Sequence, residues 1–184
     1  GHSCRHGIRR ALTRRKETTM YKVGIITSSD KGSRGEREDK GGPKIREIVE
    51  QFADDYEVAD YVMLPDEREQ LSAAMIKMAD EEGIDLIVTT GGTGFSKRDV
   101  TPEATLDVIE RRTPGISEAM RSISLEITMR AMLSRAESGI RGDTLIVNLP
   151  GSPKAIEEVL GPVLPSLKHG LDILQGKDAE CARK

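Results

Sequence analysis

Aromatic residues are scarce in this sequence. They make up 3% of the 184 residues, and tryptophan does not occur. Proteins that bind single-stranded nucleic acids stack the bases on aromatic side chains, so this scarcity argues against that class. The hydrophobic core must then consist of Val, Ile, Leu, Met and Ala, which is typical of sheets covered by helices on both faces.

Cysteine is also rare. Cys4 and Cys181 lie near opposite ends of the chain, which excludes a disulfide framework and favours a reducing, cytoplasmic location. His2 and His6 flank Cys4, but no second ligand pair at zinc-site spacing follows, so we expect no metal site there. No apolar run is long enough for a membrane span, and residues 1–19 lack the apolar stretch of a secretory signal.

The net charge of −3 is distributed unevenly along the chain. Residues 1–19 contain six basic residues and one acid, whereas the remainder has 22 basic against 30 acidic residues. An acidic body argues against a nucleic-acid partner, because counterion release needs a clustered positive face.

The length favours one domain rather than two. Met20 opens the first hydrophobic segment, so we interpret residues 1–19 as a disordered or artificially added extension. A targeting peptide and a nucleic-acid arm are the alternatives for these residues. We expect the domain to span residues 20–176 and a short tail to span 177–184.

Apolar runs with strand character alternate with segments of helical period, which is typical of α/β proteins. Strands are predicted over residues 23–27, 85–90 and 144–149, with a weaker fourth over 57–64. The second and third are almost continuously apolar, as expected for central strands buried on both faces.

Helices are predicted between these strands from apolar spacing and from capping residues. Pro43 lies in the first turn of one helix, and Asp66 is a candidate N-cap for another over 67–80. Residues 139–143 have the composition of a turn, and residues 32–38 that of a polar, mobile loop. Three further helices are predicted over 102–111, 116–135 and 153–174, the last distorted near Pro162 and Pro165.

The most informative segment follows the predicted strand 85–90. Gly91, Gly92, Thr93 and Gly94 come directly after it. Glycines permit unusual backbone conformations and remove side chains that would keep a phosphate from the amide groups. Ligands in open α/β sheets bind at the carboxyl ends of strands, so we predict an anion site here, with a purely steric turn as the alternative. The spacing matches neither a P-loop nor a dinucleotide fingerprint, which would need glycine at Lys97.

Two aspartates lie near this loop in the predicted topology. Asp99 is either a turn former before the next helix or a carboxylate that holds a cation such as Mg²⁺ beside a phosphate. Asp66 is either an N-cap or a second carboxylate at the same sheet edge. If both converge on one phosphate, they form a metal-assisted centre. Lys97 and Arg98 could neutralise phosphate oxygens or simply be solvated.

Two other strand ends carry weaker signals. After residues 144–149, Ser152 is a candidate N-cap with Pro153 as the first helical residue. A helix N-terminus binds anions, although any strand-to-helix turn has the same appearance. Ser29 and Asp30 follow the first strand in what is otherwise an ordinary loop.

Three segments together resemble the molybdopterin adenylyltransferases of the MogA/MoaB kind. They are TTGGTG at 89–94, RDVTPEAT at 98–105 and NLPGSP at 148–153, and the resemblance runs from about residue 21 to 176. It implies a three-layer α/β/α sandwich with a mostly parallel central sheet, usually as a homotrimer. It also implies Mg²⁺-dependent transfer of an adenylyl group from ATP to the terminal phosphate of molybdopterin, release of pyrophosphate, and hand-over of the product to a molybdenum-insertion protein.

The resemblance assigns roles to individual residues. Asp66 and Asp99 are the implied catalytic residues and Mg²⁺ ligands. Phe95 departs from the family, whose members often have a smaller residue or proline there. Two alternatives stay open, namely a protein that binds molybdopterin or its precursor without catalysis and a trimeric scaffold for partner peptides. The implied substrate- and phosphate-binding residues are Gly91, Gly92, Thr93, Gly94, Ser29, Asp30, Asn148, Gly151 and Ser152.

Overall fold

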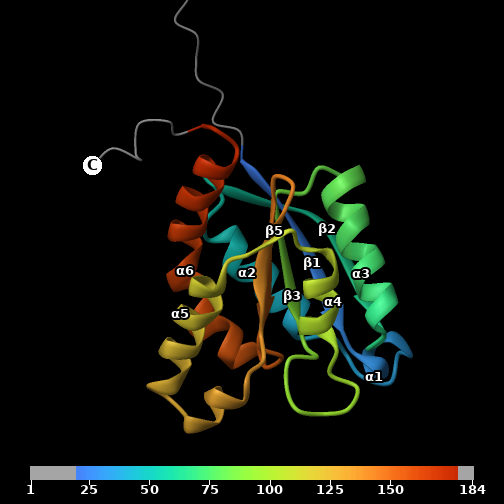
Figure 1. The fold of residues 1–184 in the computed structure, drawn as a ribbon. Helices are drawn as coiled ribbons and strands as arrows, with labels where there is room; N and C mark the ends of the chain where they lie inside the picture. Colours follow the sequence, from blue (N-terminus) through green and yellow to red (C-terminus); the bar gives the residue numbers. More distant parts are fainter. Residues whose placement is uncertain (1–19, 178–184) are drawn as a thin grey trace, which may run out of the picture.

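A central sheet of six strands runs through the computed structural model, which describes residues 20–177 (Figure 1). The strand order is β2-β1-β3-β6-β5-β4, and the first four strands are parallel. The last two pair antiparallel at one edge. The strands are β1 (Tyr21–Ser28), β2 (Tyr56–Leu64), β3 (Leu86–Thr90), β4 (Arg111–Arg112), β5 (Ser138–Arg141) and β6 (Thr144–Leu149).

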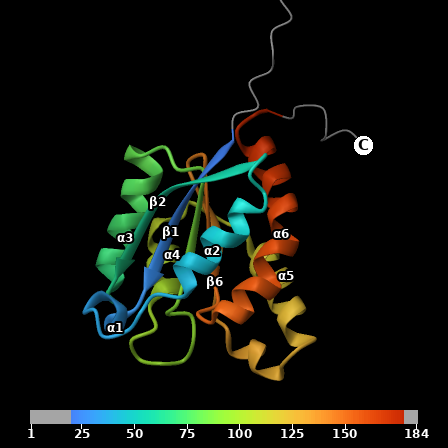
Figure 2. The same cartoon turned by 180° about the vertical axis from the view of Figure 1, so that it is seen from behind.

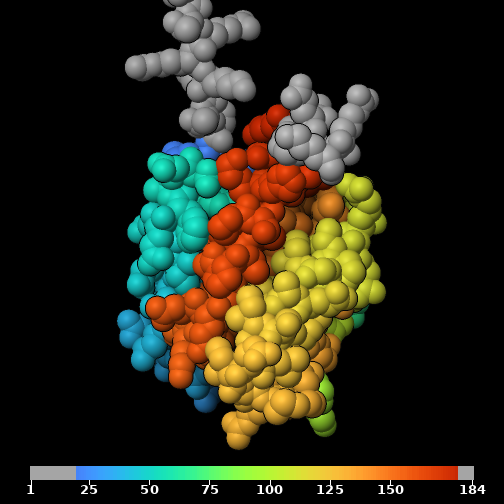
Figure 3. All heavy atoms as spheres, turned by 90° about the vertical axis from the view of Figure 1, so that its left-hand side faces the viewer, coloured from blue at the N-terminus to red at the C-terminus, as the bar shows by residue number. Residues whose placement is uncertain are grey.

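Helices cover both faces of this sheet (Figures 1 and 2). One face carries α2 (Gly41–Glu50), α5 (Pro114–Leu125) and α6 (Pro153–Leu174), which lie side by side in Figure 3. The other face carries α3 (Arg68–Ile76), the π-helical turn η1 (Lys77–Glu81) and α4 (Thr101–Val108). The predicted three-layer α/β/α sandwich with a mostly parallel sheet is therefore confirmed.

Alternation along the strands builds two separate cores. In β3, Leu86 and Val88 pack toward α2 and α6, whereas Ile87 packs toward α3 and α4. Successive side chains of a strand point to opposite faces, so one short strand serves both cores. All five residues of β3 are buried, which explains why Leu86, Ile87 and Val88 are apolar in succession rather than alternating with polar residues.

The four predicted strands are confirmed, but the two antiparallel strands, β4 and β5, were missed. Residues 139–143, interpreted as a turn, contain most of β5, and only the hairpin to β6 at Gly142, with φ +55°, is a turn. The helix predicted over 102–111 ends at Val108, and Arg111 pairs with Ile140. These strands are too short and polar to show a period of their own, and their pairing with β6 decides their conformation.

One predicted helix and one predicted loop need correction, whereas the last helix was predicted correctly. The helix predicted over 116–135 ends at Leu125 and is followed by the 3₁₀-helix η2 (Met129–Leu133), whose apolar residues are largely exposed. The loop predicted over 32–38 begins within a short helix, α1 (Asp30–Ser33), capped by the Ser29 hydroxyl. The last helix, α6, has the predicted bounds and contains Pro162 and Pro165, both of which are exposed.

The fold brings four loops to one edge of the sheet. The parallel strands β1, β2, β3 and β6 all end there, and the strand order reverses between β1 and β3. In open α/β sheets, such a reversal leaves a crevice in which ligands bind. The loop that carries Gly91–Gly94 begins at this crevice, directly after the end of β3.

Tyr56→Phe tests how α6 is attached to the sheet. Tyr56 is 1% exposed, and its hydroxyl donates to the Leu164 carbonyl oxygen across 2.6 Å. Removing the hydroxyl leaves that carbonyl without this donor, so we expect the free energy of unfolding to fall by about 0.5–1.5 kcal/mol. Urea unfolding monitored by circular dichroism measures the change, and unchanged stability would contradict the importance of this bond.

Candidate functional site

A cleft of about 710 Å³ opens at the carboxyl edge of the sheet. Its walls include the ends of β1 and β3, the start of α6 and the loop before α2. Four residues predicted from the sequence line it, namely Ser29, Gly91, Gly151 and Ser152. Two basic residues that the sequence analysis did not single out, Arg37 and Lys40, line it as well. We call this the strand-end cleft.

Two glycines at the end of β3 are required by the backbone. Gly91 and Gly92 have φ values of +89° and +70°, which side-chain-bearing residues rarely adopt. A Cβ atom on Gly91 would lie 2.4 Å from the Ser28 carbonyl oxygen, and one on Gly92 would lie 2.4 Å from Thr101 Oγ1. The steric interpretation of these glycines is thus correct. The absence of side chains at these positions also leaves the backbone amides open to the close approach of an anion, as the other interpretation requires.

The start of α4 binds carbonyl oxygens of the glycine segment, residues 91–94. The Thr101 hydroxyl donates to the Gly91 carbonyl oxygen across 3.0 Å, and the Thr101 amide donates to the Gly92 carbonyl oxygen across 3.2 Å. In the described part of the chain, the amide N–H groups of this segment donate to no protein acceptor. The segment therefore offers free donors to an anion, as a phosphate cradle does.

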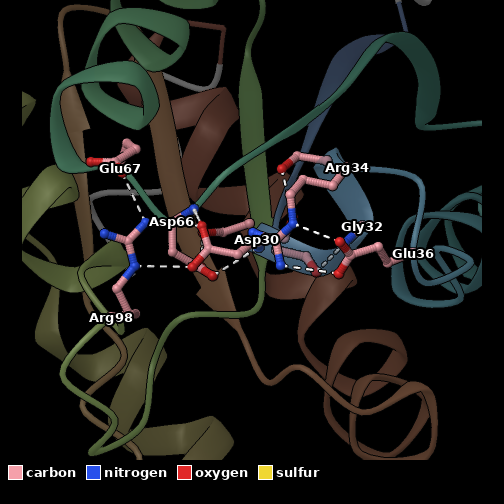
Figure 4. Close-up of polar contacts among 10 residues, drawn as sticks. Asp30, Gly32, Arg34, Glu36, Asp66, Glu67 and Arg98 are labelled. Carbon is pink, nitrogen blue, oxygen red and sulfur yellow. Dashed lines mark hydrogen bonds and ion pairs between the residues drawn. The ribbon is translucent and has the colours of Figure 1, made fainter.

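Asp66 ties the end of β2 to the end of β1 (Figure 4). Its carboxylate accepts a 2.6 Å hydrogen bond from the Ser28 hydroxyl and a 3.0 Å bond from the Asp30 amide, while the Asp66 amide donates back to Asp30. The predicted N-cap role of Asp66 is wrong, because the N-cap of α3 is Glu67. Asp66 lies instead beside the glycine segment, since a Cβ on Gly92 would be 3.4 Å from its Oδ1.

Arg98 reaches from the glycine loop to the carboxylates of the neighbouring loops (Figure 4). Its guanidinium donates two 2.9 Å hydrogen bonds to Asp30 and one of 2.8 Å to Glu67. The bonds to Asp30 are the main reason why the pKa of Asp30 falls to about 2, and the bonds to Asp30 and Glu67 together raise the pKa of Arg98. Arg98 thus neutralises protein carboxylates in this structure rather than standing free for phosphate.

Asp99 lies at the other end of the glycine segment. Its carboxylate accepts a 3.0 Å bond from the Ser96 amide, and its own amide donates to the Ser96 carbonyl oxygen, which makes it a turn former as one of the two interpretations held. A Cβ on Gly94 would lie 3.0 Å from its Oδ2. Asp66 and Asp99 therefore flank the glycine segment next to Gly92 and Gly94, respectively.

No preformed metal cage is present in residues 20–177, where no group of three or more acidic, histidine or cysteine side chains is arranged to hold an ion. Neither Asp66 nor Asp99 lines the strand-end cleft itself. The structure thus brings the two carboxylates to one loop without joining them in a single ligand set. The His2, Cys4 and His6 group lies outside the described residues.

Asn148 is held inside the protein. It is fully buried, and its amide donates to the Thr89 and Thr105 hydroxyls across 3.0 and 2.9 Å. Its carbonyl oxygen accepts a 3.0 Å bond from the Glu137 amide. Asn148 has no unused donor and thus positions the end of β6. Ser152, by contrast, is exposed, and its hydroxyl caps α6 by accepting from the Ala155 amide, as predicted.

Sequence reasoning missed two residues that support the site. Asp39 accepts hydrogen bonds from the Gly41 and Gly42 amides at the start of α2, and also from Thr27 and Tyr61. Burial, followed by the bond to Asp39, raises the pKa of Tyr61 to about 12. Arg135 contacts the glycine loop from its far side. An aspartate two residues before a glycine pair is a recognisable signal, whereas nothing local marked Arg135.

Comparison with known proteins identifies the family. Residues 24–169 match the model of the probable molybdopterin binding domain. A molybdopterin adenylyltransferase of Helicobacter pylori (strain J99) is 42% identical over 154 residues, which cover 84% of this chain and 88% of that protein. Another, of Haemophilus influenzae, is 43% identical over 143 residues, covering 78% of this chain and 73% of that protein.

A solved structure supports the same relationship. The molybdopterin biosynthesis enzyme MoaB of Thermus thermophilus superposes with a TM-score of 0.80 at 49% identity, over 85% of this chain and 98% of that one. The architecture described above is therefore the MogA/MoaB fold. No helix in residues 20–177 is long and apolar enough to cross a membrane.

Arg98→Met tests the ion pair with Asp30. We expect the pKa of Asp30 to rise from about 2 toward the usual range of aspartate, because the guanidinium bonds are the largest contribution that lowers it. A lowered pKa in the folded state contributes stability above the unfolded-state value of about 4, and this contribution is lost as the pH falls from there toward 2. Carboxyl ¹³C NMR titration measures the pKa. Arg68→Met is the control, because Arg68 bonds Asp107 and is not among the groups that lower the pKa of Asp30, and an unchanged Asp30 titration in Arg98→Met would refute the pair.

Gly91→Ala tests the backbone requirement at the end of β3. We expect this variant to lose roughly 1–3 kcal/mol in free energy of unfolding, because a side chain would force both an unfavourable φ and a clash with Ser28. Gly115→Ala in α5, where no atom lies within 4 Å of the added Cβ, should be neutral or stabilise by up to about 1 kcal/mol. Chemical unfolding compares the two variants, and equal stabilities would show that Gly91 is replaceable.

Proposed function

The chain belongs to the molybdopterin-binding domain family that its residues 24–169 match, and we propose that it is a molybdopterin adenylyltransferase. In this reaction, the terminal phosphate of molybdopterin takes the adenylyl group of ATP, and pyrophosphate leaves. One observation carries the proposal: a glycine segment with free amide donors lies between Asp66 and Asp99 at the strand-order reversal. The curated relatives named above bear the name of this activity.

This reaction needs no nucleophile from the protein. A terminal phosphate oxygen of molybdopterin attacks the α-phosphorus of ATP, and the bond from that phosphorus to the bridging oxygen of pyrophosphate breaks. Protein groups contribute by positioning the two substrates and by neutralising their charge. The free amides of residues 91–94 suit this role because they donate to phosphate oxygens without a change in protonation.

We assign the two substrates to two sides of the strand-end cleft. We assign the side of Gly151 and Ser152, at the start of the 22-residue helix α6, to molybdopterin. Ser29, which lines the cleft directly after β1, and the neighbouring Asp30 at the start of α1 are assigned to the nucleotide. The positive end of the α6 dipole favours anions in this cleft, whereas the charges of Arg37 and Lys40 are balanced by Glu38 and Asp39, which line it as well.

The residues fit a magnesium ion that binds together with the nucleotide. Magnesium in phosphoryl-transfer sites is usually held by one or two carboxylates plus substrate phosphates, so a cage of three or more protein ligands is not required. Asp66 and Asp99 would hold it from the two ends of the glycine segment. When bound there, the ion would neutralise charge on the phosphates.

The proposal extends to the setting of the enzyme. We assign the activity to the domain of residues 20–176, working as a homotrimer in the cytoplasm, with hand-over of the adenylylated product to a molybdenum-insertion protein. A family member that only binds molybdopterin is the competing function. The two differ in turnover, not in pterin affinity.

Asp66→Asn and Asp99→Asn test the proposal directly. With molybdopterin and Mg-ATP, the wild-type protein should release pyrophosphate and form adenylylated pterin in equal amounts, measured by mass spectrometry. Each variant should lose about 100-fold or more in turnover while retaining pterin binding, because each removes a carboxylate charge that acts on the phosphates.

Folding of these variants is compatible with the structure. At Asp66, an asparagine can accept from the Asp30 amide and donate to the Ser28 hydroxyl, so the link between β1 and β2 survives. Asp107→Asn on α4 is the control, because Asp107 pairs with Arg68 and touches no part of the glycine segment. Pterin binding by the wild-type protein without pyrophosphate release would show a binding protein instead.

A further inference from the structure

Arg135 joins the segment after η2 to the glycine loop. Its backbone amide donates to the Thr93 carbonyl oxygen across 2.9 Å. Nε of its side chain donates to the Gly94 carbonyl oxygen across 2.8 Å, and Nη2 donates to the Asp99 carbonyl oxygen across 2.7 Å. Nη1 forms an ion pair with Glu103 in the first turn of α4. All three guanidinium nitrogens are thus used, two of them on the same loop.

We propose that Arg135 is a positioning residue for the adenylyl transfer, which sets the conformation of the turn from Gly94 to Asp99 and thereby the place of the Asp99 carboxylate. The inference rests on the proposed function and deepens it, because Arg135 acts on the same loop without lining the strand-end cleft. It adds a role for a residue that lies outside the three motifs of the sequence.

Polar contacts have to hold this turn, because apolar packing does not. Phe95, the large apolar residue of the turn, is 70% exposed. Within the turn, only Ser96 and Asp99 bond to each other. Arg135 closes it from outside by binding the carbonyl oxygens of its first and last residues, Gly94 and Asp99. The side chain of Arg98 also anchors the turn, through its bonds to Asp30 and Glu67, but Arg135 holds the backbone at Gly94 and at Asp99 itself.

The chemistry of the contacts calls for arginine. A guanidinium is a planar fork that donates in several fixed directions at once, whereas the ammonium of lysine is a single point on a flexible stem. Glu103 neutralises the charge of Arg135, so the residue acts through the loop rather than by attracting phosphate directly. A shift of a reacting group by about 1 Å is enough to slow an enzyme on the order of 100-fold.

Arg141 provides a matched control. It likewise forms a two-bond ion pair, with Asp80, and donates to one backbone carbonyl oxygen, that of Val108. Arg141 pairs with Thr144, the first residue of β6, whereas the site lies where β6 ends. Arg141 is therefore at the opposite ends of the strands from the site. Arg141→Gln therefore removes a comparable set of contacts without touching the glycine loop.

The experiment compares Arg135→Gln, Arg135→Lys and Arg141→Gln in the full chain. Arg135→Gln should lower kcat by roughly 10- to 100-fold and change KM for Mg-ATP by less than about threefold, because substrate contacts in the cleft remain. Arg135→Lys should recover only part of kcat. Arg141→Gln should keep kcat within about twofold of wild type, since it leaves the loop intact. Equal kcat losses in Arg135→Gln and Arg141→Gln, or a change in KM alone, would overturn the proposal.

A second measurement does not depend on turnover. Trypsin cleaves after Lys97 and Arg98, both inside the turn, so the rate of cleavage there reports how firmly the turn is held. Mass spectrometry should show several-fold faster cleavage at these two sites in Arg135→Gln than in Arg141→Gln. If the wild-type protein formed no adenylylated product, the proposed function would fail, while faster cleavage would still support the hold of Arg135 on the turn. Unchanged cleavage would overturn the inference itself.

Discussion

The site depends on a close approach of backbones at Gly91. Three strand ends meet there, and a Cβ on this residue would lie 2.4 Å from the Ser28 carbonyl oxygen of β1. The Gly91 Cα in turn lies 3.6 Å from where a Cβ on Gly151, after β6, would be. Only glycine fits at this position, and glycine also permits the positive φ with which the chain leaves β3. The amides that follow therefore do not form the hydrogen bonds of a regular sheet. The same crowding that demands glycine therefore creates the donors that an anion would use.

A second constraint is the balance of charge around these donors. Asp30, Asp66 and Glu67 stand beside a segment that we expect to bind phosphates, and like charges at close range oppose one another. Arg98 compensates two of these carboxylates, and the Ser28 hydroxyl with one amide satisfies the third. The Arg98 side chain is 53% exposed, and exposed ion pairs contribute little stability. Its contacts therefore balance the charge of the site more than they stabilise the fold.

Sequence reasoning succeeded for features that neighbouring residues determine and failed for features that depend on contacts between distant parts of the chain. The central strands were predictable because burial on both faces leaves an apolar run, as in Leu86–Val88 of β3. The N-cap of α6 was predictable because Ser152 bonds an amide only three residues away. The same local reasoning misplaced Asp66, whose partners Ser28 and Asp30 come from another strand end. It also extended a helix through residues 126–135, where apolar side chains remain exposed.

By itself, the sequence determined the α/β layering, the glycine segment and its place after a buried strand, because these follow from periodicity and from backbone conformations that only glycine adopts readily. Tertiary structure alone decided which side chains surround that segment. Asp30 and Arg98 are 68 residues apart, and Arg135 is 36 residues from Asp99. Such contacts leave no periodic or local mark in the chain, because they form only where the folded sheet brings its strand ends together.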